Sequence, residues 1–260
     1  MSFFVLSLAA CFAAYAILFC IAYFFGEKIA YPAPESFYKK GDIKELFFID
    51  GKIAALYLLG NNAKFTLLYS HGNGEDIGEI YPLLKKYAEN GFNVLAYDYS
   101  GYGLSSGKPS EKAVYSNADA VYEYAQKVLK INPKNIVLAG FSMGSAPTSY
   151  LAKKHSKDVA GVIIMGGFAS GVRTVLPFNI LPFDLLENIK KVPYIDKNCK
   201  VLFIHGTKDR IVPYRNGLLM FKKSGGQKRF VCIKGAAHLN LFDFDSTLFW
   251  NSINDFKNSL

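Results

Sequence analysis

Hydrophobic positions in this 260-residue chain form short runs separated by longer mixed stretches. Runs that predict strands occur at residues 65–70, 93–98, 135–139, 159–165, 200–204 and 229–233. Stretches that predict helices lie between or after them, at residues 77–90, 110–130, 146–154, 216–223 and beyond Ser246. Strands that alternate with helices predict an α/β fold with a doubly wound, mostly parallel sheet. Two further runs, 43–50 and 52–59, flank Gly51 and predict a hairpin leading into that sheet.

The alternation is lost over about 167–198, where prolines interrupt apolar residues. We expect a short cap insert there, irregular or short-helical, above the sheet. Its apolar positions within 176–186 are Leu176, Phe178, Ile180, Leu181, Phe183, Leu185 and Leu186. Because a contiguous exposed apolar surface normally marks a binding site, we expect an acyl-binding wall with Phe178 and Phe183 as substrate-binding side chains. An ordinary surface crossover is the alternative.

The N-terminal segment has a different pattern, since residues 1–26 contain no charged side chain and are almost continuously apolar. A helix of about 20 such residues spans the hydrocarbon core of a bilayer, so we expect a transmembrane anchor at 1–26 and a linker at 27–42. A cleaved signal peptide would need a positive start and a shorter apolar stretch. The lipoprotein-like box at 8–11 lies too close to Met1, and a buried core helix is the remaining alternative.

The remaining residues, 43–260, show no repeat or linker and predict one α/β domain. The net charge of +9 comes with no nucleic-acid motif or dense basic run. We therefore expect no nucleic-acid partner, and attribute the charge to a solvated surface or to one that faces an anionic membrane. Lysines follow the apolar segment and none precedes it, so the positive-inside rule places the domain on the cytoplasmic side.

The four cysteines show neither a disulfide framework nor metal spacing, and we expect no metal or cofactor. Cys11 and Cys20 lie in the apolar segment, where either could carry an acyl chain. Cys199 and Cys232 lie at or within predicted strands, and both are expected to be buried structural thiols.

The chemistry of the chain is suggested by Gly140-Phe141-Ser142-Met143-Gly144, which matches G-x-S-x-G. A predicted strand precedes this motif and a predicted helix follows it. This is the context of a nucleophile elbow, in which a sharp turn raises the serine hydroxyl above the sheet. The motif therefore predicts a nucleophilic Ser142, against the alternative of a glycine-rich strand-to-helix turn.

An acyl-transfer serine needs a base and a carboxylate that orients the base. After a nucleophile elbow these follow in the order Asp or Glu, then His, each on a loop after a strand. Asp209 follows the penultimate predicted strand and His238 follows the last, so they are predicted to be the acid and the base. Less suitable positions are occupied by His71, His155 and His205, and by Asp98, Asp196, Asp243 and Asp245.

A tetrahedral intermediate also requires two backbone N–H donors near the nucleophile. Met143 directly follows the serine, at the start of the predicted helix. Asn73 lies between Gly72 and Gly74, in the loop after the strand at 65–70. We expect the N–H groups of Met143 and Asn73 to form the oxyanion hole.

Three further segments carry a resemblance to a known family: 97–110, 170–173 and 205–209. Over residues 31–260 the chain resembles the α/β-hydrolase domain-containing serine hydrolases, nearest the membrane-associated branch that includes protein depalmitoylases. The resemblance implies an α/β-hydrolase fold and acyl ester or acylated-protein substrates. It also implies that Ser142, Asp209 and His238 are nucleophile, acid and base. The N-terminal cysteine cluster of the depalmitoylases is replaced here by the apolar segment.

Together these features predict a membrane-anchored serine hydrolase that cleaves acyl esters or thioesters through an acyl-enzyme. A non-catalytic anchored scaffold with the same fold is the rival interpretation. Peptidase and haloalkane-type chemistry are smaller alternatives on this fold.

Overall fold

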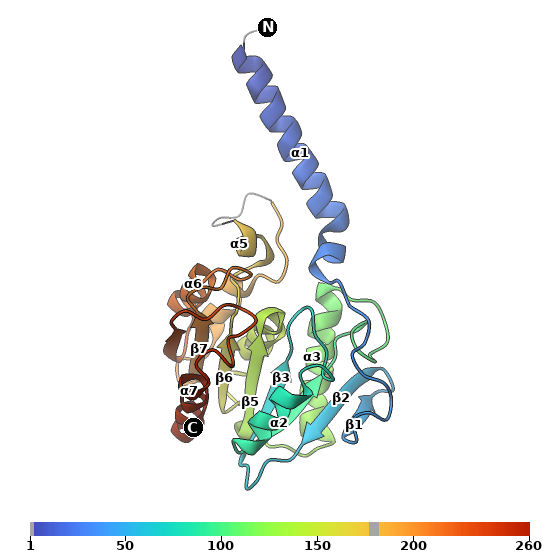
Figure 1. The fold of residues 1–260 in the computed structure, drawn as a ribbon, viewed down its shortest axis with the longest axis vertical. Coiled ribbons are helices and arrows are strands. Elements are labelled where there is room, and N and C mark those ends of the chain that lie inside the picture. Colours follow the sequence, from blue (N-terminus) through green and yellow to red (C-terminus); the bar gives the residue numbers. More distant parts are fainter. Residues whose placement is uncertain (1–2, 177–181) are drawn as a thin grey trace.

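The computed structural model describes residues 3–176 and 182–260. Within them, eight strands form one mixed sheet in the order β1-β2-β4-β3-β5-β6-β7-β8 (Figure 1). The strands are β1 (Leu46–Ile49), β2 (Ile53–Leu58), β3 (Phe65–Ser70), β4 (Phe92–Tyr97), β5 (Ile136–Phe141), β6 (Gly161–Met165), β7 (Lys200–Gly206) and β8 (Gln227–Ile233). The first three pairings in this order are β1–β2 and β2–β4, both antiparallel, and β4–β3, which is parallel like the rest. The predicted hairpin and mostly parallel sheet are confirmed.

Helices cover both faces of this sheet, as a doubly wound fold requires. The helices that follow the N-terminal one are α2 (Tyr81–Glu89), α3 (Glu111–Lys127), α4 (Ser145–His155), α5 (Gly171–Val175), α6 (Arg215–Lys223) and α7 (Ser246–Ser259). Apolar residues of α3, α4 and α6 pack into one core cluster, and those of α2 and α7 pack into another.

Side chains alternate between these two clusters along each central strand, because successive residues of a strand point to opposite faces. Leu138 of β5 lies in the first cluster, while its neighbours Val137 and Ala139 lie in the second. The parallel registers from β4 to β8 place the carboxyl ends of these strands at one edge of the sheet. The loops that leave this edge carry the predicted site residues.

Helix α1 (Phe3–Ala30) projects away from the rest of the molecule (Figure 1). Phe12, Ile17 and Phe24 are among its exposed side chains, and Cys11 and Cys20 are exposed too. In the described part of the chain, no helix meets the length and hydropathy of a membrane span, so the expected transmembrane helix at 1–26 is not confirmed.

The expected cap insert at about 167–198 contains α5 and two 3₁₀ turns, η3 (Asn188–Lys190) and η4 (Val192–Tyr194). Elsewhere one expectation is wrong. Cys199 is buried, but Cys232 is exposed. The reason is that β8 lies at the edge of the sheet, where Cys232 is exposed between the buried residues Val231 and Ile233.

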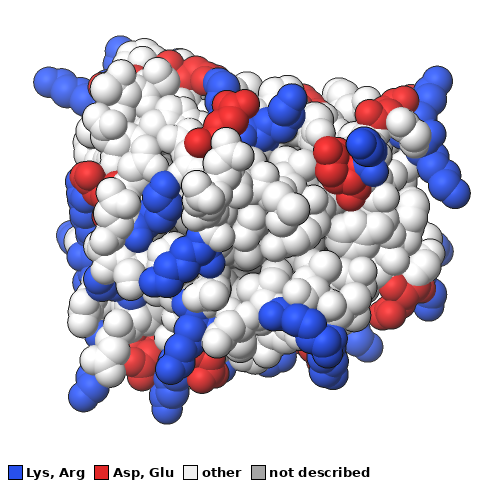
Figure 2. Space-filling model, turned by 90° about the horizontal axis from the view of Figure 1, so that it is seen from below, with Lys and Arg blue, Asp and Glu red and all other residues white. Residues whose placement is uncertain are grey.

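The face opposite α1 shows how the net positive charge is distributed (Figure 2). Lys and Arg side chains are spread over this face, at its rim and within it, with Asp and Glu among them. Several lysines pair with neighbouring carboxylates, such as Lys127 with Glu123 and Lys154 with Asp119. This distribution is that of a solvated surface with both signs of charge.

Candidate active site

Ser142 lies in a tight turn between β5 and α4. Its φ is +51°, in the left-handed region that residues other than glycine rarely adopt. The flanking glycines permit close backbone approach. A Cβ on Gly144 would lie 1.9 Å from the Ser70 carbonyl oxygen, and one on Gly140 would lie 2.1 Å from the Gly144 carbonyl oxygen. This is the geometry of a nucleophile elbow packed against the end of β3.

The structure brings Ser142, His238 and Asp209 together from three separate loops. The Nε2 atom of His238 lies 2.8 Å from Ser142 Oγ, and its Nδ1 atom lies 2.7 Å from Asp209 Oδ2. A carboxylate accepts from Nδ1–H, so Nε2 is left as the acceptor for the serine hydroxyl. The ring of His238 also stacks on Phe141, with centroids 4.8 Å apart. The arrangement can remove the serine proton during attack on a carbonyl carbon.

The carboxylate of Asp209 is buried but well supplied with hydrogen-bond donors. Its Oδ1 accepts from the N–H groups of Ile211 and Val212, at 3.0 and 2.7 Å. Burial raises the pKa of this carboxyl, but hydrogen bonds from His205 and His238, the charge of His238 and the Val212 N–H together outweigh burial and bring the pKa to about 2. Asp209 is therefore ionised throughout the neutral range, as support of an imidazolium requires.

His205, whose position in the sequence was less suitable for the base, is also a functional candidate. Its Nε2 lies 2.8 Å from the Val212 carbonyl oxygen and 3.2 Å from Asp209 Oδ2. A carbonyl only accepts, so Nε2 carries the proton and can share it with the carboxylate. The available signal was its position four residues before Asp209, at the end of the same strand.

The loop after β3 is held by its own backbone and by a nearby carboxyl. Nδ1 of His71 donates to the Gly72 carbonyl oxygen at 2.7 Å, and Gly72 N–H donates to Glu75 Oε1 at 2.6 Å. Burial raises the pKa of Glu75 to about 7, although the Gly72 N–H lowers it in part. Because Gly72 N–H is already used, it is not available as an oxyanion donor.

Within the described part of the chain, the side chain of Asn73 is hydrogen-bonded and its backbone N–H is not. Its side-chain Nδ2 donates to the Ala30 carbonyl oxygen at 2.8 Å, and its Oδ1 accepts from Tyr102 Oη at 2.6 Å. Among the residues that the structure describes, none accepts a hydrogen bond from the Asn73 N–H. Met143 is the second residue of the 3₁₀ turn η2 (Ser142–Gly144), where N–H groups have no acceptor within the helix. Both predicted oxyanion donors are thus backbone groups at the same edge of the sheet.

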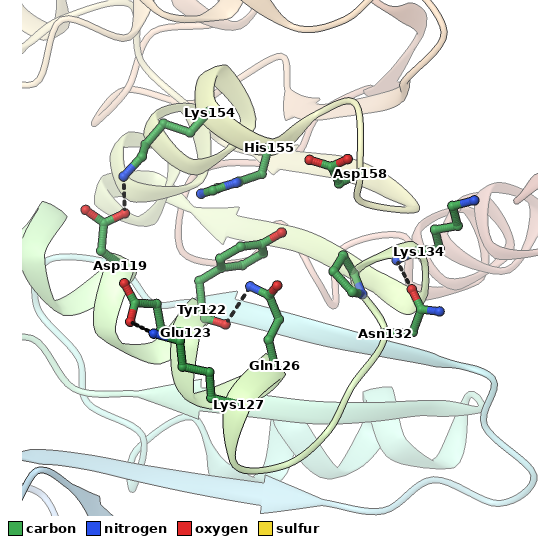
Figure 3. Close-up of a pocket in the computed structure, with 11 residues that line it drawn as sticks. Asp119, Tyr122, Glu123, Gln126, Lys127, Asn132, Lys134, Lys154, His155 and Asp158 are labelled. Carbon is green, nitrogen blue, oxygen red and sulfur yellow. Dashed lines mark hydrogen bonds and ion pairs between the residues drawn. The ribbon is translucent and has the colours of Figure 1, made fainter.

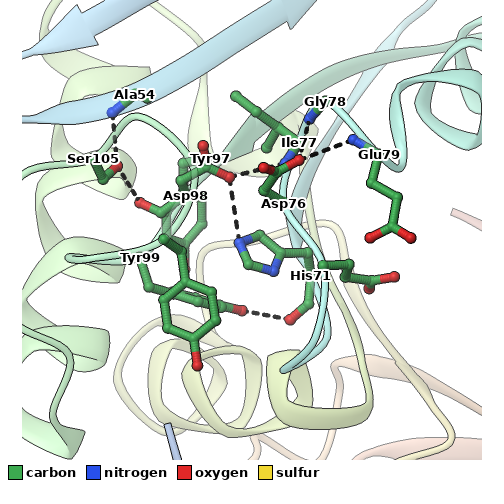
Figure 4. Close-up of polar contacts among 12 residues, drawn as sticks. Ala54, His71, Asp76, Ile77, Gly78, Glu79, Tyr97, Asp98, Tyr99 and Ser105 are labelled. Carbon is green, nitrogen blue, oxygen red and sulfur yellow. Dashed lines mark hydrogen bonds and ion pairs between the residues drawn. The ribbon is translucent and has the colours of Figure 1, made fainter. Parts of the chain in front are cut away.

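A buried polar cluster stabilises the strand ends behind this loop (Figure 4). Asp98 accepts from Tyr38 Oη at 2.6 Å and from Ile77 N–H at 2.8 Å, and it lies 3.5 Å from His71 Nε2. Burial raises the pKa of Asp98 to about 7 and lowers that of His71 to about 4. His71 is therefore neutral at pH 7. Asp98 holds its own loop in place, which agrees with its exclusion as the triad acid.

The two predicted substrate-binding phenylalanines have different outcomes. Phe178 lies outside the described residues. Phe183 is partly buried, and its ring makes an edge contact with Phe19 of α1 at a centroid distance of 5.3 Å. The cap insert is thus in contact with the N-terminal helix.

A groove of about 440 Å³ lies between α3 and α4, away from the triad (Figure 3). His155 stacks on Tyr122 there, with ring centroids 4.2 Å apart, and burial lowers the pKa of His155. Charges of both signs line the groove, and Lys154 is already paired with Asp119. This groove has no nucleophile poised beside a base.

Among residues 3–176 and 182–260, no three His, Cys, Asp or Glu side chains converge as metal ligands would.

Residues 66–189 match the family described as alpha/beta hydrolase fold. The chain is 33% identical over 205 residues to alpha/beta hydrolase domain-containing protein 17C of Mus musculus, a match covering 76% of this chain and 63% of the relative. It is 35% identical over 191 residues to protein 17B of Homo sapiens, covering 72% of this chain and 65% of the relative. The chain thus spans a little under two thirds of the length of these relatives.

Two solved structures share the fold at low sequence identity. Est1E from Butyrivibrio proteoclasticus, with ferulic acid bound, has a TM-score of 0.67 and 21% identity, covering 82% of this chain and 98% of that one. The Pyrococcus furiosus esterase Pf2001 has a TM-score of 0.68 and 15% identity, covering 88% and 98%. At these identities the two similarities show a shared fold.

Proposed function

This chain is an α/β-hydrolase-fold protein related in sequence to the alpha/beta hydrolase domain-containing proteins, and we propose that it is a serine hydrolase acting on acyl esters or thioesters. The observation that carries the proposal is the relay from Asp209 through His238 to Ser142, with contacts of 2.7 and 2.8 Å. The left-handed backbone of Ser142 in the elbow turn adds support, because strained backbone of this kind is concentrated at functional sites.

In this proposal Ser142 Oγ attacks the acyl carbon while His238 Nε2 takes its proton. The negative charge that develops on the carbonyl oxygen accepts hydrogen bonds from the N–H groups of Met143 and Asn73. The imidazolium then gives its proton to the leaving oxygen or sulfur, and the acyl-enzyme forms. Water attacks the acyl-enzyme with His238 again as base, which releases the acid and restores the serine. Asp209 orients the ring and supports its positive charge throughout.

The surface around Asp209 and His238 carries exposed apolar side chains, which suit the acyl group of a substrate. Leu239 directly follows His238 and is 82% exposed, and Ile211 lies two residues after Asp209 and is 55% exposed. The apolar cap insert, with Phe183, lies at the same edge of the sheet, next to α1. We infer that this edge receives an acyl chain, as in the depalmitoylase branch that the sequence resembles. Both an acylated protein and a small acyl ester fit this description.

We further propose that α1 holds the domain at a lipid bilayer, with the domain on the cytoplasmic side. Its exposed apolar side chains, among them Phe12, Ile17 and Phe24, would each gain free energy by leaving water. Vesicle co-sedimentation of the full chain, with and without residues 1–26, tests this attachment separately from catalysis.

The catalytic proposal is tested by labelling with a fluorophosphonate probe and by hydrolysis of a soluble acyl ester. Ser142→Ala should abolish both and leave the thermal transition nearly unchanged. Ser149→Ala is the matched control, because Ser149 Oγ in α4 is buried and has no hydrogen-bond partner among the described residues. If Ser142→Ala keeps most of the activity, the serine-hydrolase proposal is wrong. If the wild type is neither labelled by the probe nor able to hydrolyse any ester, the result favours the non-catalytic scaffold.

A further inference from the structure

The loop after β3 that carries Asn73, called the oxyanion loop below, is attached through the Asn73 side chain to segments far away in the sequence. Both ends of its amide are used, Nδ2 toward the Ala30 carbonyl oxygen and Oδ1 toward Tyr102 Oη. The Ala30 carbonyl can only accept, so it fixes which end of the amide is the nitrogen. With its side chain held on both sides, Asn73 can present only its backbone N–H to a substrate oxygen.

The Ala30 carbonyl is itself held in place by the last turn of α1. The final carbonyls of a helix have no acceptor role within it and are free for such a contact. Tyr31, the next residue, is only 3% exposed and belongs to the main core cluster, and its N–H donates to the Glu27 carbonyl oxygen at 2.9 Å. Glu27 Oε1 accepts from the Glu111 N–H at the start of α3. The end of α1 is therefore docked on the domain.

Tyr102 is fixed equally well from the other side. Its ring is fully buried and meets Tyr99 edge-on at 5.6 Å, and its N–H donates to the Tyr99 carbonyl oxygen at 2.9 Å. The following residue, Gly103, has a φ of +48°, and a Cβ there would lie 2.0 Å from Asp98 Oδ2. Burial raises the pKa of Tyr102 to about 12, so its hydroxyl stays protonated and donates to Asn73.

We infer that Tyr102 and the side chain of Asn73 are positioning residues, which clamp the oxyanion loop between the glycine-rich loop after β4 and the last turn of α1. This inference rests on the proposed serine-hydrolase function. The clamp sets the direction of the Asn73 N–H, which would touch the developing oxyanion. The last turn of α1 is consequently part of the scaffold of the active site.

Loss of the clamp should affect the transition state more than substrate binding. The oxyanion contact forms fully only as charge develops, so a misdirected N–H lowers kcat with little change in KM. In other hydrolytic enzymes, removal of one oxyanion-hole donor lowers kcat on the order of 100- to 1,000-fold. A donor that is displaced but not deleted should cost less: we expect about tenfold for Tyr102→Phe and about 10- to 100-fold for Asn73→Ala.

The experiment uses the full chain in detergent, with kcat and KM measured on a short soluble ester and binding measured for a trifluoromethyl ketone that forms a tetrahedral adduct. The variants are Tyr102→Phe and Asn73→Ala, and Tyr81→Phe is the matched control. Tyr81 Oη donates to Glu45 Oε2 at 3.0 Å in a partly buried contact outside the clamp, so that control should change kcat and KM by no more than twofold. We expect parallel losses in kcat and ketone affinity, a KM within about twofold and an unchanged melting temperature.

Two outcomes would overturn the inference. One is an unchanged kcat in both clamp variants, and the other is a loss carried by KM or by a lowered melting temperature alone. In either case Ser142→Ala distinguishes this failure from failure of the proposed function. If that variant is inactive while the clamp variants are fully active, only the positioning role is wrong.

Discussion

Replacement of Asp209 by Asn tests the relay most sharply, because the contacts around the carboxyl dictate how the amide must sit. Oδ1 accepts from the N–H groups of Ile211 and Val212, so the amide oxygen of Asn should occupy that position. The amide nitrogen then faces His238 Nδ1, which lies 2.7 Å from the present Oδ2. An NH₂ group donates there, so Nδ1 must become the acceptor.

This change forces the proton of His238 onto Nε2, the atom that lies 2.8 Å from Ser142 Oγ. Nε2 can then no longer take the serine proton. The same substitution in a Ser-His-Asp protease costs about 10⁴ in kcat through the wrong tautomer, which corresponds to roughly 5.5 kcal/mol of transition-state stabilisation. We expect a loss of that order in kcat/KM here.

The assay is ester hydrolysis together with the rate of fluorophosphonate labelling, between pH 6 and 9. Because the pKa of Asp209 is held at about 2, protonation of this carboxyl should not limit the wild type in that range. Asp196→Asn is the matched control, since Asp196 lies before β7 and only caps its own turn through the Asn198 N–H at 2.9 Å. Activity of Asp209→Asn within tenfold of wild type, with Ser142→Ala inactive, would refute the proposed role of Asp209.

Three further predictions concern the helix, the insert and the buried cluster. Deletion of residues 1–26 should move the protein from the membrane to the soluble fraction and preserve hydrolysis of small esters, because Ala30 remains; protease accessibility outside intact cells would contradict the cytoplasmic orientation. kcat/KM should rise from acetyl to about octanoyl esters, and each four methylenes buried at about 0.8 kcal/mol apiece should contribute up to on the order of a hundredfold. Phe178→Ala and Phe183→Ala should flatten that rise, and a preference for acetyl esters would refute the acyl wall. The raised pKa of Asp98 means that the folded state binds this proton more tightly than the unfolded state, so its contribution to stability is lost as the pH rises from about 4 to about 7. Asp98→Asn should remove that component from urea-unfolding free energies measured between pH 5 and 7.5, and an identical pH slope in both proteins would contradict it.

The sequence was sufficient for the features that depend on local pattern. Alternating apolar runs predicted the strands and the helices between them, because burial on two faces of a sheet imposes that pattern. The glycines around Ser142 predicted the elbow for a steric reason that is local to one turn. Asp209 and His238 could be chosen because the carboxyl ends of parallel strands meet at one edge, so position after a strand already implies proximity.

Features that depend on tertiary packing leave no comparable pattern in the chain. His205 was set aside as a less suitable base, and only the fold places its Nε2 3.2 Å from Asp209 Oδ2. Cys232 looked buried because its strand is apolar, but strand order puts β8 at an exposed edge.

The clamp on the oxyanion loop is the clearest case of a feature that only the tertiary structure decided. Asn73 and Ala30 are 43 residues apart, and Asn73 and Tyr102 are 29 apart, with no shared motif. Hydrogen bonds of this kind have no period in the chain, because they depend on how the end of α1 docks against the loops after β3 and β4. Periodicity and turn chemistry determine which elements form and which loops meet, whereas the packing of those loops determines which polar groups are left free to act.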